Sequence, residues 1–87
     1  MGVDNYKTVP KMGIERLIEE ALSCGCIVVN PIEHYSIDEI IILSELARKN
    51  DLILSIKEYR SNFYQGTTIN LTKRSRIKEC DYFINHI

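Results

Sequence analysis

The sequence predicts a small single-domain α/β protein of the α+β type, in which two helices cover one face of a three- to four-stranded mixed sheet. At 87 residues, with 45% hydrophobic and 26% charged residues, the chain is long enough for one compact core. Two segments carry apolar residues at helical spacing, and the others are β-branched runs or alternate between apolar and polar residues. The expected order is (β)-α-β-α-β-β followed by a C-terminal helix or strand, with residues 1–87 forming one domain.

The first helix should follow Pro10, because a residue without an N–H suits the first turn of a helix. Before it, residues 1–10 form either an edge strand that ends at Pro10 or a disordered segment. One apolar stripe with charged residues opposite indicates the helix, and Gly25 ends it in the left-handed conformation. The stripe consists of Ile14, Leu17, Ile18, Ala21 and Leu22.

A buried strand and a second helix come next. Residues 26–30 are apolar, rich in β-branched side chains and followed by Pro31, which is typical of a buried strand. Ser36 and Glu39 have the spacing of a capping box, so the second helix begins at Ile37. Its body is apolar on more than one face, which predicts packing against both the sheet and the first helix. Asn50 is expected to take the left-handed exit.

From residue 52 the apolar period changes to two, which predicts a β-hairpin. The core face of its first strand holds Leu52, Leu54 and Ile56. The second strand, residues 68–73, should bury Ile69 and Leu71, with residues 60–66 as the loop. Its alternate polar residues are expected to be exposed, namely Thr68, Asn70 and Thr72.

Residues 75–87 allow two interpretations. The spacing of Ile77, Cys80, Ile84 and Ile87 favours a helix, with Ser75 as its N-cap. Residues 82–84, which are aromatic and β-branched, would equally suit a short last strand. The helix is the favoured interpretation.

The strand–helix–strand unit over residues 26–56 is expected to be parallel with a right-handed crossover, and the hairpin then adds an antiparallel strand. This order of elements is similar to that of the Alba chromatin proteins and of the C-terminal domain of a bacterial translation initiation factor. Both bind nucleic acid, so the resemblance implies a nucleic-acid-binding function. It lies in the order of elements and not in any motif.

The charges are separated along the chain although the net charge is only −1. Six of the eleven basic residues fall between Lys57 and Lys78, where Glu58 is the one acidic residue. The first 56 residues hold five basic and nine acidic residues. Such separation would let one edge of the domain meet a polyanion.

The hairpin region 57–78 is therefore the predicted binding surface of a small non-enzymatic nucleic-acid-binding protein. Its cations would contact phosphates, and its aromatic rings would stack on unpaired bases. The candidate site residues are Lys57, Tyr59, Arg60, Asn62, Phe63, Tyr64, Gln65, Lys73, Arg74, Arg76 and Lys78. A plainer interpretation is that these lysines and arginines only protect an exposed sheet edge from strand addition.

A second functional class uses the same surface. Aromatic residues and arginine dominate many protein interfaces, so the chain would also suit a regulatory or inhibitory protein that binds an acidic surface of a larger protein, including one encoded by a phage or other mobile element. Self-association through a sheet edge, giving a homodimer, is a further expectation. With no apolar stretch long enough for a membrane span and no export signal at the N-terminus, the expected location is the cytoplasm.

Other candidate chemistry is weaker. Cys24, Cys26 and Cys80 make an odd count, which argues against a disulfide framework and favours free buried thiols. A C-x-C spacing without a second paired motif does not predict zinc, so no metal or cofactor is expected. Polar residues that follow the strand over 26–30 suit a small-ligand site at the end of a parallel strand, namely Asn30, Glu33, His34 and Ser36. His86 has no convergent partners in the sequence.

Overall fold

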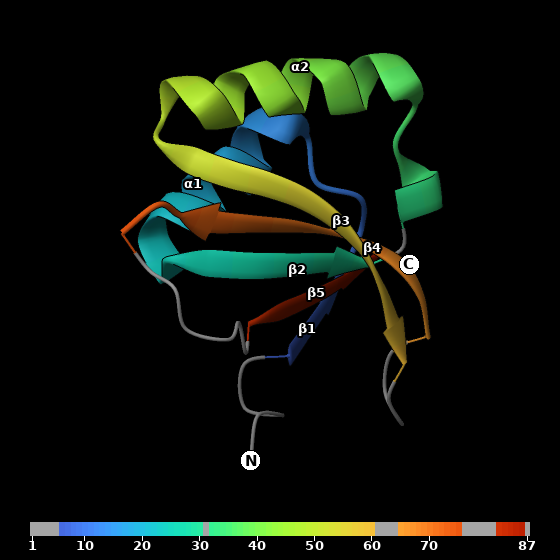
Figure 1. The fold of residues 1–87 in the computed structure, drawn as a ribbon. Helices are drawn as coiled ribbons and strands as arrows, with labels where there is room; N and C mark the ends of the chain where they lie inside the picture. The colour runs from blue at the N-terminus through green and yellow to red at the C-terminus, as the bar shows by residue number, and fades with distance from the viewer. Residues whose placement is uncertain (1–5, 31, 61–64, 76–81, 87) are drawn as a thin grey trace.

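The computed structural model describes residues 6–30, 32–60, 65–75 and 82–86 and shows a five-stranded sheet with two helices on one face (Figure 1). The predicted α+β class, with helices packed against a mixed sheet, is confirmed. In chain order the elements are β1 (Tyr6–Val9), α1 (Ile14–Cys24), β2 (Cys26–Asn30), the short 3-10 helix η2 (Ile32–His34), α2 (Ile37–Lys49), β3 (Leu52–Arg60), β4 (Gln65–Lys73) and β5 (Phe83–His86).

The strands are ordered β1-β5-β2-β4-β3. The two strands that each helix connects are therefore not neighbours, because a strand from later in the chain lies between them. Strand β4 is antiparallel to both β2 and β3, and therefore β2 and β3 run in the same direction, as predicted for residues 26–56. They are not neighbours, because β4 lies between them. Strand β5 is parallel to both β1 and β2 and lies between those two strands in the same way. The predicted edge strand before Pro10 is β1.

The favoured helix over residues 75–87 is wrong for residues 83–86, which form β5. Ile84 and His86 are both buried and lie two residues apart, which is the period of a strand. In this position β5 has a neighbouring strand on each side, so its backbone groups form hydrogen bonds that a helix would have to make internally. Residues 76–81 and 87, on which the helical spacing also depended, lie outside the described residues.

Helix α1 begins at Ile14, later than expected from Pro10, with Gly13 as its N-cap. The delay has a tertiary cause, because the backbone of Met12 bonds to distant side chains: its N–H donates to His86 Nε2 and its carbonyl oxygen accepts from the Tyr35 hydroxyl. The predicted end is confirmed. Gly25 has φ 91°, and its N–H donates to the carbonyl oxygen of Ala21.

The predicted capping box of α2 is confirmed. The Glu39 N–H donates to Ser36 Oγ at 3.1 Å, and the Ser36 N–H donates to Glu39 Oε1 at 2.9 Å. At the other end, the left-handed residue is Asp51 (φ 60°), one position later than predicted, whereas Asn50 has φ −102°. The helix contacts α1 and β3, as expected from its wide apolar surface.

One core fills the space between the helices and the sheet. Its fully buried residues come from both helices and from the three middle strands, and include Leu17, Leu43, Ile27, Val29, Ile69, Leu71 and Ile84. Strand β4 contributes both of its predicted core residues, Ile69 and Leu71. This burial places β4 and β2 at the centre of the molecule and leaves β3 at an edge.

The β3–β4 hairpin was predicted correctly in its direction and its faces, but not in its exposure. Ile56 pairs with Ile69 and shares its face, yet it is 51% exposed. Thr68 and Asn70 are buried rather than exposed. Both differences arise because β4 is a central strand with neighbours on each side, whereas β3, the strand that holds Ile56, is at the edge. Strand β4 starts at Gln65, so the connection to Arg60 is shorter than the predicted loop.

Candidate functional site

The structure brings one part of the predicted site together at the end of the hairpin nearest its loop. Arg60 pairs with Gln65 in the last position of the ladder, and Lys57 pairs with Thr68 three positions earlier. Lys57, Arg60 and Gln65 are all exposed, and Tyr59 is half-buried. We call these four residues, Lys57, Tyr59, Arg60 and Gln65, the hairpin tip. The predicted site residues between them, Asn62, Phe63 and Tyr64, lie outside the described residues.

The tip presents its side chains on both faces of the sheet. Lys57 and Tyr59 point away from the helices together with Ile53, because alternate residues of a strand share a face. Arg60 points to the helix side. The Tyr59 ring packs edge-on against Phe83 of β5, with ring centroids 5.5 Å apart and an angle of 82° between the planes. This contact holds the tyrosine ring on the face away from the helices.

The other described cations of the predicted site lie at the opposite end of the same hairpin. Lys73 pairs with Leu52, at the first position of β3, whereas Arg60 occupies the last. At the usual rise of a strand the two positions are about 26 Å apart. Arg74 donates from Nε to Asp51 Oδ1 at 3.1 Å and is thus engaged in an ion pair. Arg76 and Lys78 lie outside the described residues. One copy of the chain therefore does not gather Arg60 and Lys73 into one surface.

A hollow of about 450 Å³ lies at the hairpin tip and is lined by Glu58, Arg60, Gln65 and Gly66. Gly66 has φ 130°, a conformation that side chains rarely adopt. A side chain there would start 3.9 Å from Asn30 Oδ1, so the end of β2 adjoins the hollow. The hollow holds a carboxylate and a guanidinium, which suits a polar ligand of mixed character.

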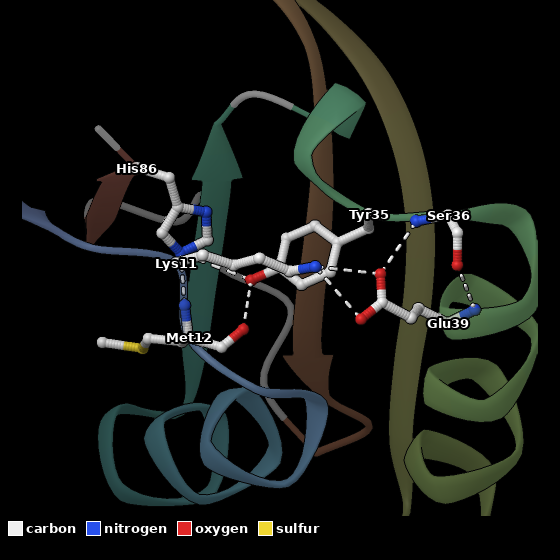
Figure 2. Close-up of polar contacts among 6 residues, drawn as sticks. All are labelled: Lys11, Met12, Tyr35, Ser36, Glu39 and His86. Atoms are coloured by element: carbon white, nitrogen blue, oxygen red, sulfur yellow. Dashed lines mark hydrogen bonds and ion pairs between the residues drawn. The ribbon is translucent and has the colours of Figure 1, made fainter.

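A second group of polar residues lies where β1, β2 and β5 end, and Figure 2 shows its contacts. The Tyr35 hydroxyl donates to the Met12 carbonyl oxygen at 2.7 Å and lies 3.3 Å from His86 Nε2. The Met12 N–H donates to the same nitrogen at 3.3 Å. His86 thus joins the end of β5 to the segments before α1 and α2, and the expectation that it has no convergent partners is wrong. Met12 and His86 are 74 positions apart, which hides the contact from the sequence.

The charged part of this group is an exposed ion pair. Lys11 Nζ donates to both carboxylate oxygens of Glu39, at 3.0 and 3.1 Å, and lies 4.9 Å from the centre of the Tyr35 ring. The Ser36 N–H and Lys11 lower the pKa of Glu39. Since Glu39 also completes the capping box of α2, its carboxylate is committed to stabilising the fold.

Burial determines the protonation of the two buried rings. It raises the pKa of Tyr35, with a further contribution from Glu39, so the hydroxyl stays a donor at neutral pH. Burial also lowers the pKa of His86, with help from the nearby His34 and Lys11. Because His86 Nε2 accepts from the Met12 N–H, the neutral ring carries its proton on Nδ1. We call this group, Lys11, Met12, Tyr35, Glu39 and His86, the polar cluster. It fastens three segments together and leaves neither ring available as a general base at its Nε2 or Oη atom.

Two of the four residues predicted for a small-ligand site, His34 and Ser36, contact the polar cluster. His34 stacks on His86, with ring centroids 5.8 Å apart and planes 13° from parallel, and Ser36 caps α2. Glu33 is exposed. His34 lines neither the hollow at the hairpin tip nor the groove described below. What the structure shows for His34 is the stacking of its ring on His86.

The cysteines differ from the expectation of free thiols. Cys26 is disulfide-bonded, so the prediction is wrong for Cys26, whereas Cys24 is not part of a disulfide. An odd count excludes complete pairing yet leaves room for one disulfide. Cys80 lies outside the described residues. Among the residues that the structure describes, no three histidine, cysteine or acidic side chains are placed to hold a metal ion.

The sequence did not predict an apolar groove between α2 and the edge strand β3. Its volume is about 520 Å³, and its lining residues are Ile40, Ile41, Ser44, Glu45, Arg48 and Leu54. Ile37, on the same side of α2 and one turn before Ile41, is 76% exposed. The wide apolar surface of α2 was the available signal, but it was interpreted as buried on both sides.

No protein-family model, curated protein or solved structure matches this chain. The resemblance to Alba proteins and to the initiation-factor domain thus stays a likeness in the order of elements. In the part of the chain that the structure describes, no helix is long and apolar enough to cross a membrane.

Proposed function

We propose that this protein is a non-enzymatic nucleic-acid-binding protein that contacts its ligand with the hairpin tip. One observation carries the proposal: Lys57 and Arg60 are exposed and have no ion partner among the described residues. Lys11, Arg16 and Arg74, by contrast, each form an ion pair. Cations that are not used within the fold are available for phosphates, whose counterions are released on binding.

The arrangement favours single strands over duplexes. Tyr59 lies between Lys57 and Arg60 in the sequence, and the contact with Phe83 fixes its ring at the surface that Lys57 shares. A fixed aromatic ring next to Lys57 can stack on an unpaired base while this lysine contacts the phosphate of that nucleotide. Arg60 points to the other face of the strand, so it would contact a phosphate further along the nucleic acid. Gln65 adds an amide that can donate to a base edge or accept from it.

The expected binding is weak and sensitive to salt. If Lys57 and Arg60 each replace one counterion, the logarithm of the association constant should fall with the logarithm of salt concentration with a slope of about −1.4 for a single strand. Glu58, which lies between the two cations, limits the local charge and lowers affinity further.

Fluorescence anisotropy with labelled single-stranded and double-stranded RNA and DNA at low salt tests the proposal. Arg60→Glu should reduce the affinity at least tenfold, whereas Arg16→Glu, the same charge change on α1, should leave it within about twofold. Circular dichroism verifies that both variants are folded. No binding at low salt, or equal losses in the two variants, would refute the proposal.

A second candidate is binding to an acidic surface of a larger protein. Ile53 is 44% exposed and shares its face with Lys57 and Tyr59, so an apolar contact lies next to a cation. A pull-down from cells, repeated after nuclease treatment, separates the two candidates. A complex that survives the nuclease and is lost in Ile53→Asp supports the protein partner, and a complex that the nuclease removes supports nucleic acid.

A further inference from the structure

The two edges of the sheet differ in how well they are protected. At one edge, β1 has only four residues. At the other, β3 has nine, and within it Ile53 and Ile56 are exposed. A long apolar edge strand is a template for pairing with another strand. Within the described sheet, β3 is therefore the edge strand that is better suited to pairing with another strand.

The free hydrogen-bonding groups of this edge can be assigned to residues. The Arg74 N–H donates to the Asp51 carbonyl oxygen at 3.1 Å, one position beyond the Leu52–Lys73 pair. In an antiparallel ladder each residue directs both backbone groups to the same neighbour, and successive residues alternate. Odd-numbered residues of β3 thus bond to β4. The even-numbered ones present their N–H and C=O groups at the edge, and they are Leu52, Leu54, Ile56, Glu58 and Arg60.

We propose that two copies of this chain pair β3 with β3 in an antiparallel arrangement, with Ile56 of one copy opposite Ile56 of the other. Ile56 is the middle residue of the nine, so this register pairs the whole strand. The five outward-facing residues of each copy would then form about ten backbone hydrogen bonds. The sheet becomes continuous through both copies, and the exposed Ile56 side chains cover each other.

The charges are compatible with this register and disfavour two neighbouring ones. A two-fold axis at residue 57 or 58 would place Lys57 opposite Lys57 or Glu58 opposite Glu58, which is unfavourable. With the axis at Ile56, Lys57 lies opposite Ser55 of the partner copy. Glu58 lies opposite the partner copy's Leu54, on the helix side, where Leu54 lines the same groove as Arg48. The acidic residue of one copy thus meets the guanidinium in the groove of the other.

The dimer also changes the binding surface, a consequence that rests on the proposed function. Arg60 of one copy lies opposite Leu52 of the other, and Leu52 pairs in turn with Lys73 of its own hairpin. Arg60 and Lys73, which one copy holds at opposite ends of the hairpin, are therefore brought to the same end by two copies. The dimer therefore has two such pairs of cations, and each copy contributes one residue to each pair.

Light scattering during size-exclusion chromatography measures the assembly directly. The wild-type chain should elute with twice the chain mass of 10.1 kDa. Ile56→Lys should elute as a monomer, because it puts two like charges at the axis. Ile42→Lys is the matched control: Ile42 is 46% exposed on α2 but does not line the groove, so this variant should remain a dimer. A monomeric wild type, or an Ile56→Lys variant that remains dimeric, would overturn the proposal.

A charge exchange tests the register. Glu58→Arg and Arg48→Glu should each weaken the dimer by roughly two- to fivefold in sedimentation equilibrium, and the double variant should recover most of the loss. Additive losses in the double variant would contradict this register.

Oligonucleotide titrations of the same samples separate the two proposals. A dimer without affinity for nucleic acid refutes the proposed function and leaves the pairing of β3 intact. A monomer that binds nucleic acid refutes the pairing and leaves the proposed function intact.

Discussion

The half of the molecule built from β1, β5 and β2 differs from the hairpin half in how it uses polar side chains. In the first half, the polar cluster ties the segments before α1 and α2 to the end of β5. In the second, Lys57 and Arg60 are exposed without ion partners among the described residues, and Ile53 and Ile56 are exposed beside them. A side chain committed to internal contacts is not available to a ligand. The difference shows that polar contacts hold the fold together at one end, and it supports the proposal that recognition takes place at the other.

The largest expected effect is on the free energy of unfolding, and it distinguishes the buried face of the hairpin from the exposed one. Leu71 is fully buried in β4, so Leu71→Ala should reduce the free energy of unfolding by about 2–5 kcal/mol through lost burial and a cavity. Ile53→Ala, at an exposed site of the paired strand, should cost less than about 1 kcal/mol. Urea denaturation measures both. Comparable losses would contradict the assignment of the hairpin's faces.

The polar cluster should matter for stability and not for binding. Tyr35→Phe leaves the Met12 carbonyl oxygen without its buried donor and should reduce the free energy of unfolding by about 1–2 kcal/mol. Tyr82→Phe is the control, since its hydroxyl contacts Glu20 at 3.3 Å in a half-buried position and should contribute less. Affinity for oligonucleotides should be unchanged in both. A tenfold loss of affinity in Tyr35→Phe would contradict binding at the hairpin tip, because it would show that the polar cluster takes part in recognition.

The helix cap gives a smaller effect. Ser36→Ala removes the hydroxyl that accepts from the Glu39 N–H and should reduce the free energy of unfolding by about 1 kcal/mol. Ser44→Ala changes an exposed serine within the same helix and should cost nothing or stabilise slightly. Thermal denaturation of the two variants compares them. Equal melting temperatures would show that the capping box contributes nothing measurable.

The smallest effect is a dependence on pH. The pKa of His86 is lowered from 6.5 by burial and by the nearby His34 and Lys11, so the folded state binds a proton less readily than the unfolded state. The stability from this group is complete above pH 6.5 and is lost as the pH falls through the lowered value. NMR titration of the His86 ring should give a pKa below 6.5. A value at or above 6.5 would contradict the packing of the ring against Met12 and Tyr35.

Features set by neighbouring residues were predictable from the sequence. The capping box depends on two residues three positions apart, Ser36 and Glu39, and the end of α1 depends on the conformational freedom of Gly25. The alternation of Leu52, Leu54 and Ile56 identified the faces of β3 correctly. Each of these signals is complete within one element.

Features that depend on pairing between distant segments were not predictable in this way. The insertion of β5 between β1 and β2, and of β4 between β2 and β3, decides which residues are buried. Thr68 and Asn70 have the pattern of an exposed face but are buried in a central strand, where the Thr68 hydroxyl lies 2.9 Å from Asn70 Oδ1. His86 became part of the polar cluster for the same reason.

The charge segregation along the chain shows the limit most clearly. Basic residues that are close together in the sequence were expected to form one surface. Arg60 and Lys73, however, lie at opposite ends of a ladder of nine residue pairs. Two residues on the opposite strands of a hairpin lie close together only when both are near the same end of the paired strands. Distance along the chain is therefore a poor guide to the distance between these cations.

The most direct test of the account is an NMR titration of the ¹⁵N-labelled protein with single-stranded RNA, following each backbone amide. We expect the largest shifts at Lys57, Tyr59, Arg60 and Gln65, with no comparable change at Lys11, Tyr35 or His86. Largest shifts at the polar cluster, or none at the hairpin tip with saturating RNA, would contradict the claim that recognition takes place at the hairpin.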